Sequence, residues 1–567
     1  MDNLEKINIE NVDWKSSREF FESLGETLDK LDNKDESYDF TWVGKRKSII
    51  EAGAPISKTL RPDIDASKDF NNTKNMLIVG DNLDALKILQ ESYLGKIKTI
   101  YIDPPYNTGH DFVYHDNFSV KKGEYSDDST DTDGNRIVSE DEFIANSKSN
   151  GRFHSDWLSM MYPRLRLARN LLSDDGLIFI SIDDNEDYNL QKLCNEIFGE
   201  DNFVNKIVWY YGKMSNESNK LANNHEYVLV YKKTDAGGIY KKVKKEDSEY
   251  RNRYLRFVTP ENTVKYGDVK NSTDNLIIGR VKKVKAELKK DELDDDDVLF
   301  DFNKEFKPHS DTIYHSIIKG NAEENVKEFD MGQKPLGLIE LYLELSTDPG
   351  DIVLDFFAGS GTTGHAVMDL NAKDNGDRKF ICVQINEKTD DKSEAAKSGY
   401  DSIDMITANR LRKFGDIISR ENPDKDLDVG FRVFRIDSGN ENDDIRKPLN
   451  EIHQSNIFEM VDNIKKDRTP LDLLFGVVYA SALPFDLDLD IRKIGDNTVY
   501  LYGYLDESSG LVACFDDEIT EDTIKEIAKL KPLTAVFKDT SFKESADKIN
   551  LSEHFRIISP ETKVKVL

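Results

Sequence analysis

The chain has 567 residues, with 108 Asp and Glu against 78 Lys and Arg, which gives a formal net charge of −30. At about 150 residues per domain, this length predicts three to four domains. Hydrophobic residues make up 38% and aromatic residues 10%, enough to form several cores, so wholesale disorder is excluded. A uniformly acidic surface would repel nucleic acid, but the charge is distributed unevenly along this chain.

Cysteine spacing and hydropathy exclude further classes. Cys194, Cys382 and Cys514 lie far apart, without a CxxC or a Cys/His cluster, so neither a disulfide framework nor a metal site is expected. The N-terminus has no apolar run typical of a signal peptide, and no stretch reaches the about 18 apolar residues of a membrane span. We expect a soluble cytoplasmic protein with no membrane partner.

The spacing of apolar residues predicts strands and helices that alternate along the chain. Predicted strands cover 76–79, 99–102, 177–182, 207–211, 352–354 and 380–385, and predicted helices cover 81–93, 157–172 and 337–345, with another helix starting at 364. Strands that alternate with helices indicate an α/β fold with a doubly wound parallel sheet. Further strands at 498–504 and 511–515 predict a separate C-terminal α+β domain.

A basic block interrupts this alternation. Residues 206–290 hold 20 Lys and Arg against 10 Asp and Glu, and an acidic run follows at 291–297. The basic clusters are KKVKK at 241–245, Arg251, Arg253, Arg256 and KKVK at 282–285. A solvated surface position is the simpler interpretation of any single lysine here. As a block, the cluster predicts a DNA-binding module, because phosphate contacts need Lys and Arg.

A glycine-rich turn follows the predicted strand 352–354. The sequence DFFAGSGTTG at 355–364 leads from this strand into a helix, whose N–H groups can face an anion. It is not a P-loop, since GxxxxGK[ST] is absent, and a GxG alone is often only a tight turn. Gln384 ends the next strand, where a doubly wound fold places a ribose-binding side chain, with Glu387 as the alternative.

A second motif, Asp103-Pro104-Pro105-Tyr106, ends the predicted strand 99–102. The two prolines cannot continue a sheet, so they form a rigid turn that sets a carboxylate beside a backbone carbonyl and an aromatic ring. Two acceptors and a stacking face suit an exocyclic amino group on a planar base. A base in a duplex reaches such a pocket only when it is flipped out. Taken alone, the motif is equally well explained as a proline-rich turn.

Together, the two motifs resemble those of amino-directed DNA methyltransferases that use S-adenosylmethionine. The catalytic motif precedes the cofactor motif, which is the order of the β class, with a target recognition domain inserted between the two halves. The segments NMLIVGDNLDALKIL, GKIKTIYIDPPYNTGHDFVYHDNF and WLSMMYPRLRLARNLLSDDGLIFISIDD, KPLGLI at 334–339, and VFKDTSFKESADKINL at 536–551 resemble, more narrowly, the modification subunit of type III restriction–modification systems. This resemblance is weakest in 212–325.

The resemblance implies a role for each motif residue. Asp103 and the Pro104 carbonyl would accept hydrogen bonds from the target amino group, Pro105 would shape the turn, and Tyr106 would stack on the flipped base. The residues implied for cofactor binding are Asp81, Lys334, Pro335, Asp355, Phe357, Gly359, Gly361, Thr362, Thr363 and Gln384. Many related enzymes have an acidic residue in place of Gln384, but an amide also accepts hydrogen bonds.

The resemblance also implies domains and partners. It assigns 1–70 to an N-terminal extension, 71–211 with 326–415 to a Rossmann-like catalytic domain, 212–325 to target recognition, and 416–567 to dimer or partner contacts. The implied partners are double-stranded DNA, a second copy of the chain, and a separate helicase–nuclease restriction subunit.

The activity implied is adenine-N6 methylation, since Asp rather than Ser at position 103 favours adenine. The alternatives are a cytosine-N4 DNA methyltransferase, an orphan methyltransferase without a restriction partner, a specificity subunit without catalysis, and a protein or RNA methyltransferase. The intact DPPY and FAGSGTT motifs argue against a chain that has lost catalysis. The size of the basic insertion weakens the protein or RNA reading.

Overall fold

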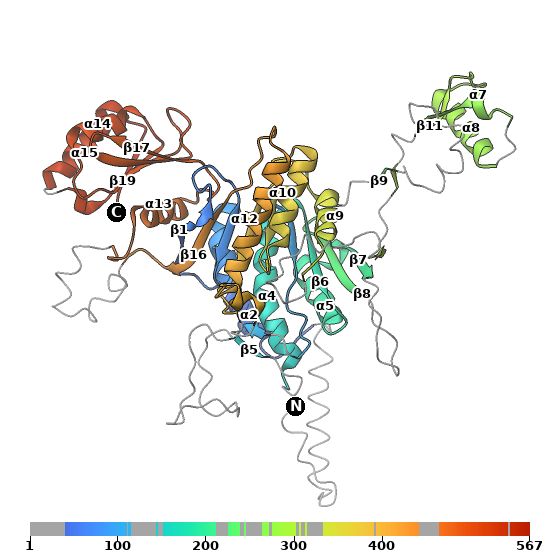
Figure 1. Cartoon of the computed structure of the whole chain (residues 1–567), viewed down its shortest axis with the longest axis horizontal. Coiled ribbons are helices and arrows are strands. Elements are labelled where there is room, and N and C mark those ends of the chain that lie inside the picture. The colour runs from blue at the N-terminus through green and yellow to red at the C-terminus, as the bar shows by residue number, and fades with distance from the viewer. Residues whose placement is uncertain are drawn as a thin grey trace, which may run out of the picture. The chain divides into compact units, whose positions relative to one another are not determined.

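The structure is a computed structural model (Figure 1). The chain divides into two units, residues 1–43 and 44–567. The structure describes residues 40–109, 112–114, 143–145, 151–210, 225–238, 243–244, 263–271, 275–301, 306–307, 312–314, 333–389, 393–441, 464–542 and 545–567. In the first unit, the rings of Phe40 and Trp42 lie 5.4 Å apart. All helices and strands named below belong to the second unit.

A ten-stranded sheet forms the centre of the second unit, with the order β1-β16-β2-β15-β14-β3-β6-β8-β7-β13. These strands are β1 (Lys58–Lys68), β16 (Phe431–Ser438), β2 (Met76–Val79), β15 (Lys379–Gln384), β14 (Ile352–Asp355), β3 (Ile97–Ile102), β6 (Leu172–Ile182), β8 (His225–Lys232), β7 (Phe203–Tyr210) and β13 (Thr312–Tyr314). Neighbours from β16 to β6 pair in parallel, whereas β1 is antiparallel to β16, and β8 is antiparallel to both β6 and β7.

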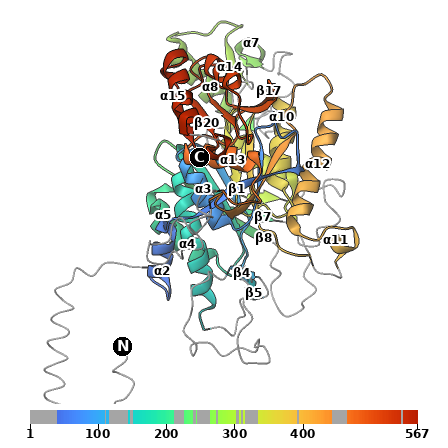
Figure 2. The same ribbon diagram turned by 90° about the vertical axis from the view of Figure 1, so that its left-hand side faces the viewer.

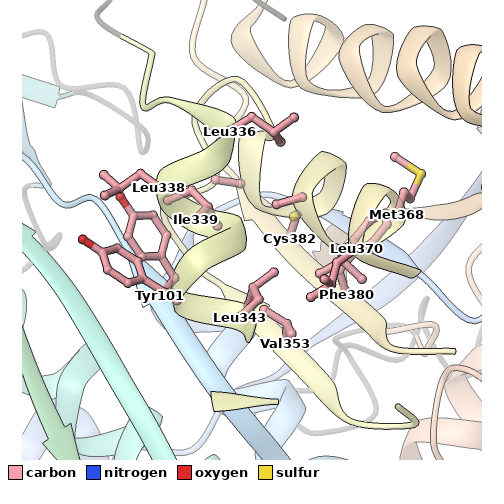
Figure 3. Packing of buried hydrophobic residues seen from close by; sticks show 14 of the residues in the cluster. Tyr101, Leu336, Leu338, Ile339, Leu343, Val353, Met368, Leu370, Phe380 and Cys382 are labelled. Atoms are coloured by element: carbon pink, nitrogen blue, oxygen red, sulfur yellow. The ribbon is translucent and has the colours of Figure 1, made fainter. Parts of the chain in front are cut away.

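Helices cover both faces of this sheet (Figures 1 and 2). One face packs under α9 (Leu336–Ser346), α10 (Thr362–Asp374) and α12 (Ile403–Glu421), and the other contacts α3 (Asn82–Tyr93), α4 (Phe153–Leu171) and α5 (Asp187–Phe198). Alternate strand residues point to opposite faces. Tyr101 and Cys382 join the core under α9, while Ile100 and Ile381 are equally buried on the other side. In Figure 3, Leu338 and the other α9 side chains lie between Tyr101 and the α10 residues. The predicted doubly wound α/β fold is confirmed.

Strands β3 and β14 are hydrogen-bonded neighbours in parallel register, with Thr99 opposite Val353 and Ile100 opposite Leu354. The proline motif leaves the end of β3, and the glycine motif leaves the end of β14. Parallel strands present their carboxyl ends at one edge, so two motifs far apart in sequence meet there.

Smaller elements surround this sheet. Two small antiparallel sheets pair β4 (Phe112–Tyr114) with β5 (Phe143–Ala145), and β9 (Val243–Lys244) with β12 (Phe306–Lys307). A small module contains β10 (Thr263–Lys265), α7 (Tyr266–Val269), α8 (Asn275–Leu288) and β11 (Val298–Asp301). The remaining helices outside the C-terminal part are α2 (Lys45–Gly53), η2 (Glu200–Asn202) and α11 (Glu394–Lys397).

The C-terminal part forms its own core on a five-stranded sheet. It contains α13 (Pro470–Ala480), β17 (Leu489–Ile494), β18 (Asn497–Tyr502), β19 (Leu511–Cys514), α14 (Glu521–Lys529), β20 (Thr534–Phe537), η9 (Asp539–Ser541), α15 (Ser545–Ile558) and β21 (Lys563–Val566). Arg432 of β16 is fully buried and donates to the carbonyl oxygens of Phe485 at 2.6 Å and Leu487 at 2.7 Å. A buried guanidinium needs such partners, so this residue ties the C-terminal part to the central sheet.

The predicted strands and helices are confirmed, with differences at their ends. Helix α10 begins at Thr362, because Gly361 takes the left-handed conformation (φ 82°) just before it. Strand β6 begins at Leu172, the last residue of the predicted helix 157–172 and five residues before the predicted strand, and its register against β3 is irregular. Strands β8 and β13 of the central sheet come from 212–325, and the division into domains stays a prediction. Among the described residues, no helix is long and apolar enough to cross a membrane.

Candidate active site

The glycine motif is built around the buried carboxylate of Asp355. Its Oδ1 accepts from the Phe357 N–H at 3.0 Å, and its Oδ2 accepts from the Thr363 hydroxyl at 2.5 Å. The carboxylate therefore joins both ends of the turn. Burial is the main cause that raises the pKa of Asp355, to about 7, against the effect of these two hydrogen bonds.

Gly359, at the tip of this turn, is held on both sides. The Gln384 Oε1 atom accepts from the Gly359 N–H at 2.8 Å, and the Thr407 hydroxyl donates to the Gly359 carbonyl at 2.6 Å. Gly359 and Gly361 both have positive φ, 51° and 82°, which side chains disfavour. Gly361 is the N-cap of α10 and provides no side-chain cap, so the first N–H groups of the helix lack the usual side-chain acceptor.

The proline motif is supported from behind by α4 and the start of α5. Trp157 Nε1 donates to the Pro105 carbonyl at 2.8 Å. Asn107 (φ 58°) donates to Glu186 Oε1 at 2.5 Å and to the Phe153 carbonyl at 3.2 Å. These contacts use the carbonyl of Pro105, and none of the hydrogen bonds found among the described residues uses the Pro104 carbonyl.

The side chains of Asp103 and Tyr106 in this motif meet those of Lys334 and Glu226, which come from distant parts of the chain. Lys334 Nζ donates to the Tyr106 hydroxyl at 2.6 Å and to Glu226 Oε2 at 2.5 Å. The same Nζ lies 3.5 Å from Asp103 Oδ1, and the Tyr106 hydroxyl donates to Glu226 at 3.1 Å. Lys334 precedes α9, and Glu226 is the second residue of β8, so the two flank the motif from opposite segments.

The charges in this cluster act on one another. Burial raises the pKa of Asp103, while the Lys334 ammonium opposes that rise and Glu226 adds to it. Burial disfavours the charged form of Lys334, but Asp103 and Glu226 outweigh this effect and leave its pKa raised. The cluster therefore holds a cation beside a carboxylate whose pKa is raised by burial.

Two residues implied for cofactor binding make contacts within the protein. Asp81 is the N-cap of α3, where its Oδ1 accepts from the Leu83 N–H at 2.6 Å. Its Oδ2 lies 3.3 Å from the buried Arg164 guanidinium. Pro335 is the N-cap residue of α9. Their roles toward a cofactor stay predictions.

Comparison with known proteins matches residues 97–395 to a family of DNA methylases, a range that contains both motifs. The StyLTI Mod subunit of a Salmonella typhimurium type III restriction–modification enzyme is 35% identical over 72% of this chain and 67% of its own length. The EcoP15I Mod subunit of Escherichia coli is 33% identical over 71% of both chains. The type II methyltransferase M.KpnI of Klebsiella pneumoniae is 32% identical over 61% of this chain and 89% of its own. This chain belongs to the DNA methylase family, among the type III Mod subunits.

The glycine turn of this methylase fits its cofactor, S-adenosylmethionine. The N-terminus of α10 opens at the end of β14 without a side-chain cap, which suits the carboxylate of an amino acid. Asp103 Oδ1 is buried without a hydrogen bond to any described residue and forms an ion pair with Lys334 at 3.5 Å. Phe357, Gly359, Thr362 and Thr363 lie in or directly after the same turn, and their predicted contacts with the cofactor stay predictions.

Sequence reasoning missed Glu226, Trp157 and Glu186. The run YVLVY at 227–231 has the β-branched and aromatic composition of a strand, which indicates β8 and places the preceding Glu226 at its start. The sequence carries no comparable signal for the hydrogen bonds of Trp157 and Glu186, because they cross between elements. His365 is buried, and the centre of its ring lies 4.0 Å from that of Phe414. Arg251, Arg253 and Arg256 lie outside the described residues.

Proposed function

We propose that this methylase transfers a methyl group from S-adenosylmethionine to N6 of a flipped adenine, as the modification and recognition subunit of a type III restriction–modification system. The observation that carries the proposal is the arrangement of two motifs at neighbouring strand ends. The turn that starts at Asp103 and the turn that starts at Asp355 leave β3 and β14, which pair directly. Direct transfer needs the methyl acceptor and the methyl donor side by side, and two turns that leave neighbouring strands can hold them so.

The proposed roles follow from the acceptors at the proline motif. Asp103 and the Pro104 carbonyl accept hydrogen bonds from the amino group and draw its lone pair out of conjugation with the ring. Tyr106 stacks on the base. Burial raises the pKa of Asp103, which suits this carboxylate to receive the proton that the nitrogen loses. The cofactor supplies an electrophilic methyl group when it is bound.

The remaining elements of the proposal concern DNA and protein partners. Residues 212–325 are proposed to read the target sequence, and 416–567 to contact a second copy or a restriction subunit. The exposed lysines of α8 support DNA contact, since phosphate neutralisation needs accessible cations. We propose a homodimer, in which one copy reads DNA while the other methylates. A cytoplasmic location would give the enzyme access to the chromosome.

The decisive experiment incubates the purified protein with unmethylated genomic DNA and labelled S-adenosylmethionine, and then sequences single molecules. We expect N6-methyladenine on one strand of a short asymmetric site. Modification of both strands of a palindrome would contradict the type III assignment, and N4-methylcytosine alone would contradict adenine as the target. The Asp103→Asn variant should transfer no methyl group, whereas the exposed-site control Asp424→Asn should match the parent protein.

A further inference from the structure

The Lys334 ammonium lies closer to Glu226 than to Asp103. The distance from Lys334 Nζ is 2.5 Å to Glu226 Oε2 but 3.5 Å to Asp103 Oδ1. The first is a hydrogen-bonded ion pair, and the second is beyond ordinary hydrogen-bond length for a charged pair. Asp103 Oδ1 is accordingly buried without a hydrogen bond to the described residues, and its ion pair with Lys334 is the longer of the two.

Two aromatic rings support Lys334 in this position. Its Nζ lies 4.9 Å from the centre of the Tyr106 ring and 5.3 Å from that of Trp209. Trp209 of β7 is the register partner of Glu226 across the β7–β8 pair. The strand pairing therefore fixes both the anion and one of the rings that hold the ammonium.

A lysine bonded directly to Asp103 would compete with the target amino group. A charge-assisted hydrogen bond is roughly twice as strong as a neutral one, so the ammonium would displace a neutral amino group from the same oxygen. The charge balance points the same way. Asp103, Glu226 and Lys334 together carry one net negative charge, which favours the positive charge that develops on the nitrogen during methyl transfer.

We propose that Glu226 is a positioning residue that withholds Lys334 from Asp103 and so keeps Asp103 open to the target amino group. This inference rests on the proposed methyl transfer and extends it to a residue outside both motifs. Without the Glu226 charge, the ammonium moves onto Asp103, and the enzyme loses its acceptor while its cofactor turn stays intact.

The pH dependence of the rate gives a readout that a purely structural role would not move. The groups that face Asp103 are Lys334, Tyr106, Glu226, Tyr101 and Asp355. Glu226 raises the pKa of Asp103 and Lys334 lowers it. Removing the Glu226 charge should therefore lower the pKa of Asp103 and shift the acidic limb of kcat to lower pH.

The test compares Glu226→Gln with the parent enzyme and with Glu200→Gln, an exposed isosteric control. For E226Q we expect kcat to fall at least tenfold, with the acidic limb at lower pH. Adding Lys334→Met to E226Q should recover several-fold of that loss, because the competing cation is gone. A wild-type kcat for E226Q overturns the proposal. The proposal also fails if the acidic limb of E226Q does not move and the double variant is no faster than E226Q.

A crystal structure of E226Q supplies an independent measurement. We expect Lys334 Nζ within about 2.7–2.9 Å of an Asp103 oxygen, the length of a charge-assisted bond. An ammonium that stays at its present distance contradicts the inference. The activity of the parent enzyme distinguishes a failure of the proposed function from a failure of the role of Glu226. If it transfers no methyl group, the proposed function fails, whereas normal transfer by both the parent enzyme and E226Q removes only the role of Glu226.

Discussion

Gln384 holds the backbone N–H of Gly359 at 2.8 Å, so the end of one strand fixes the tip of the turn that follows its neighbour. Strands β15 and β14 pair in parallel, and the side chain spans the gap between their ends. Gln384, which is expected to bind a ribose, therefore also holds the glycine turn in the structure. A cofactor would meet a turn that is already held in place, which lowers the ordering cost of binding.

The Gln384→Ala variant should bind S-adenosylmethionine about tenfold more weakly. The loss of one hydrogen bond in the turn should cost about 1.4 kcal/mol of binding free energy. Isothermal titration calorimetry measures the dissociation constant. Gln90→Ala is the matched control, because Gln90 donates to carbonyl oxygens of α3 and α4 and not to the turn. Equal weakening in both variants would show that the contact with Gly359 has no specific part in cofactor binding.

Asp355 should make stability depend on pH. Its pKa of about 7 lies above the ordinary value of 3.8, so between these values the folded chain keeps a proton that the unfolded chain loses. The contribution is fully present below about pH 4 and is lost as pH rises toward 7. Relative to the parent protein, Asp355→Asn should therefore gain stability by at most about 1.4 kcal/mol per pH unit across this window.

Urea unfolding of the parent protein and D355N at pH 5, 6 and 7 would measure this gain. The exposed Asp424→Asn variant controls for a change in net charge. A constant difference between the parent protein and D355N at all three pH values would contradict the raised pKa.

Trp157 should act through the proline turn. In Trp157→Phe, an aromatic ring remains in the buried site, but the donor to the Pro105 carbonyl is lost. We expect kcat to fall about fivefold, equivalent to about 1 kcal/mol, because the turn that carries Asp103 is less well fixed. Steady-state kinetics measure the fall, and cofactor affinity should stay at the parent value. An unchanged kcat would mean that the prolines alone hold the turn.

Three exposed lysines of the small module test the DNA contact. Lys270 forms an ion pair with Asp295 at 2.8 Å, and Lys282 and Lys283 lie on α8. The double variant K282Q/K283Q should reduce the slope of log K against log salt for DNA binding by about 0.9 per lost phosphate contact. Fluorescence anisotropy across a salt series measures the slope. Lys270→Gln should change it less, and the reverse order would assign the DNA surface to another face.

The sequence allowed the sheet and its motifs to be predicted because apolar runs such as Met76–Val79 mark buried strands locally. It did not reveal Glu226, since that residue reaches the site only through the pairing of β8 between β6 and β7. Lys334 illustrates the same limit. The family resemblance assigned it to the cofactor, which stays a prediction, but local spacing did not reveal that its ammonium contacts Tyr106 and Glu226. Sheet order and register decide such contacts, and neither is written in local spacing.

The interleaving of strands at one edge of the central sheet has a consequence for synthesis. Within the described sheet, β1 pairs only with β16, and β2 needs β15 and β16. At about 5–20 residues per second, a ribosome needs on the order of tens of seconds between synthesising β1 and β2 and synthesising their partners β15 and β16. During that interval the apolar strand at 76–79 has no partner to cover its edges. Nascent chains of this methylase should therefore depend on holding chaperones until residue 438 has emerged.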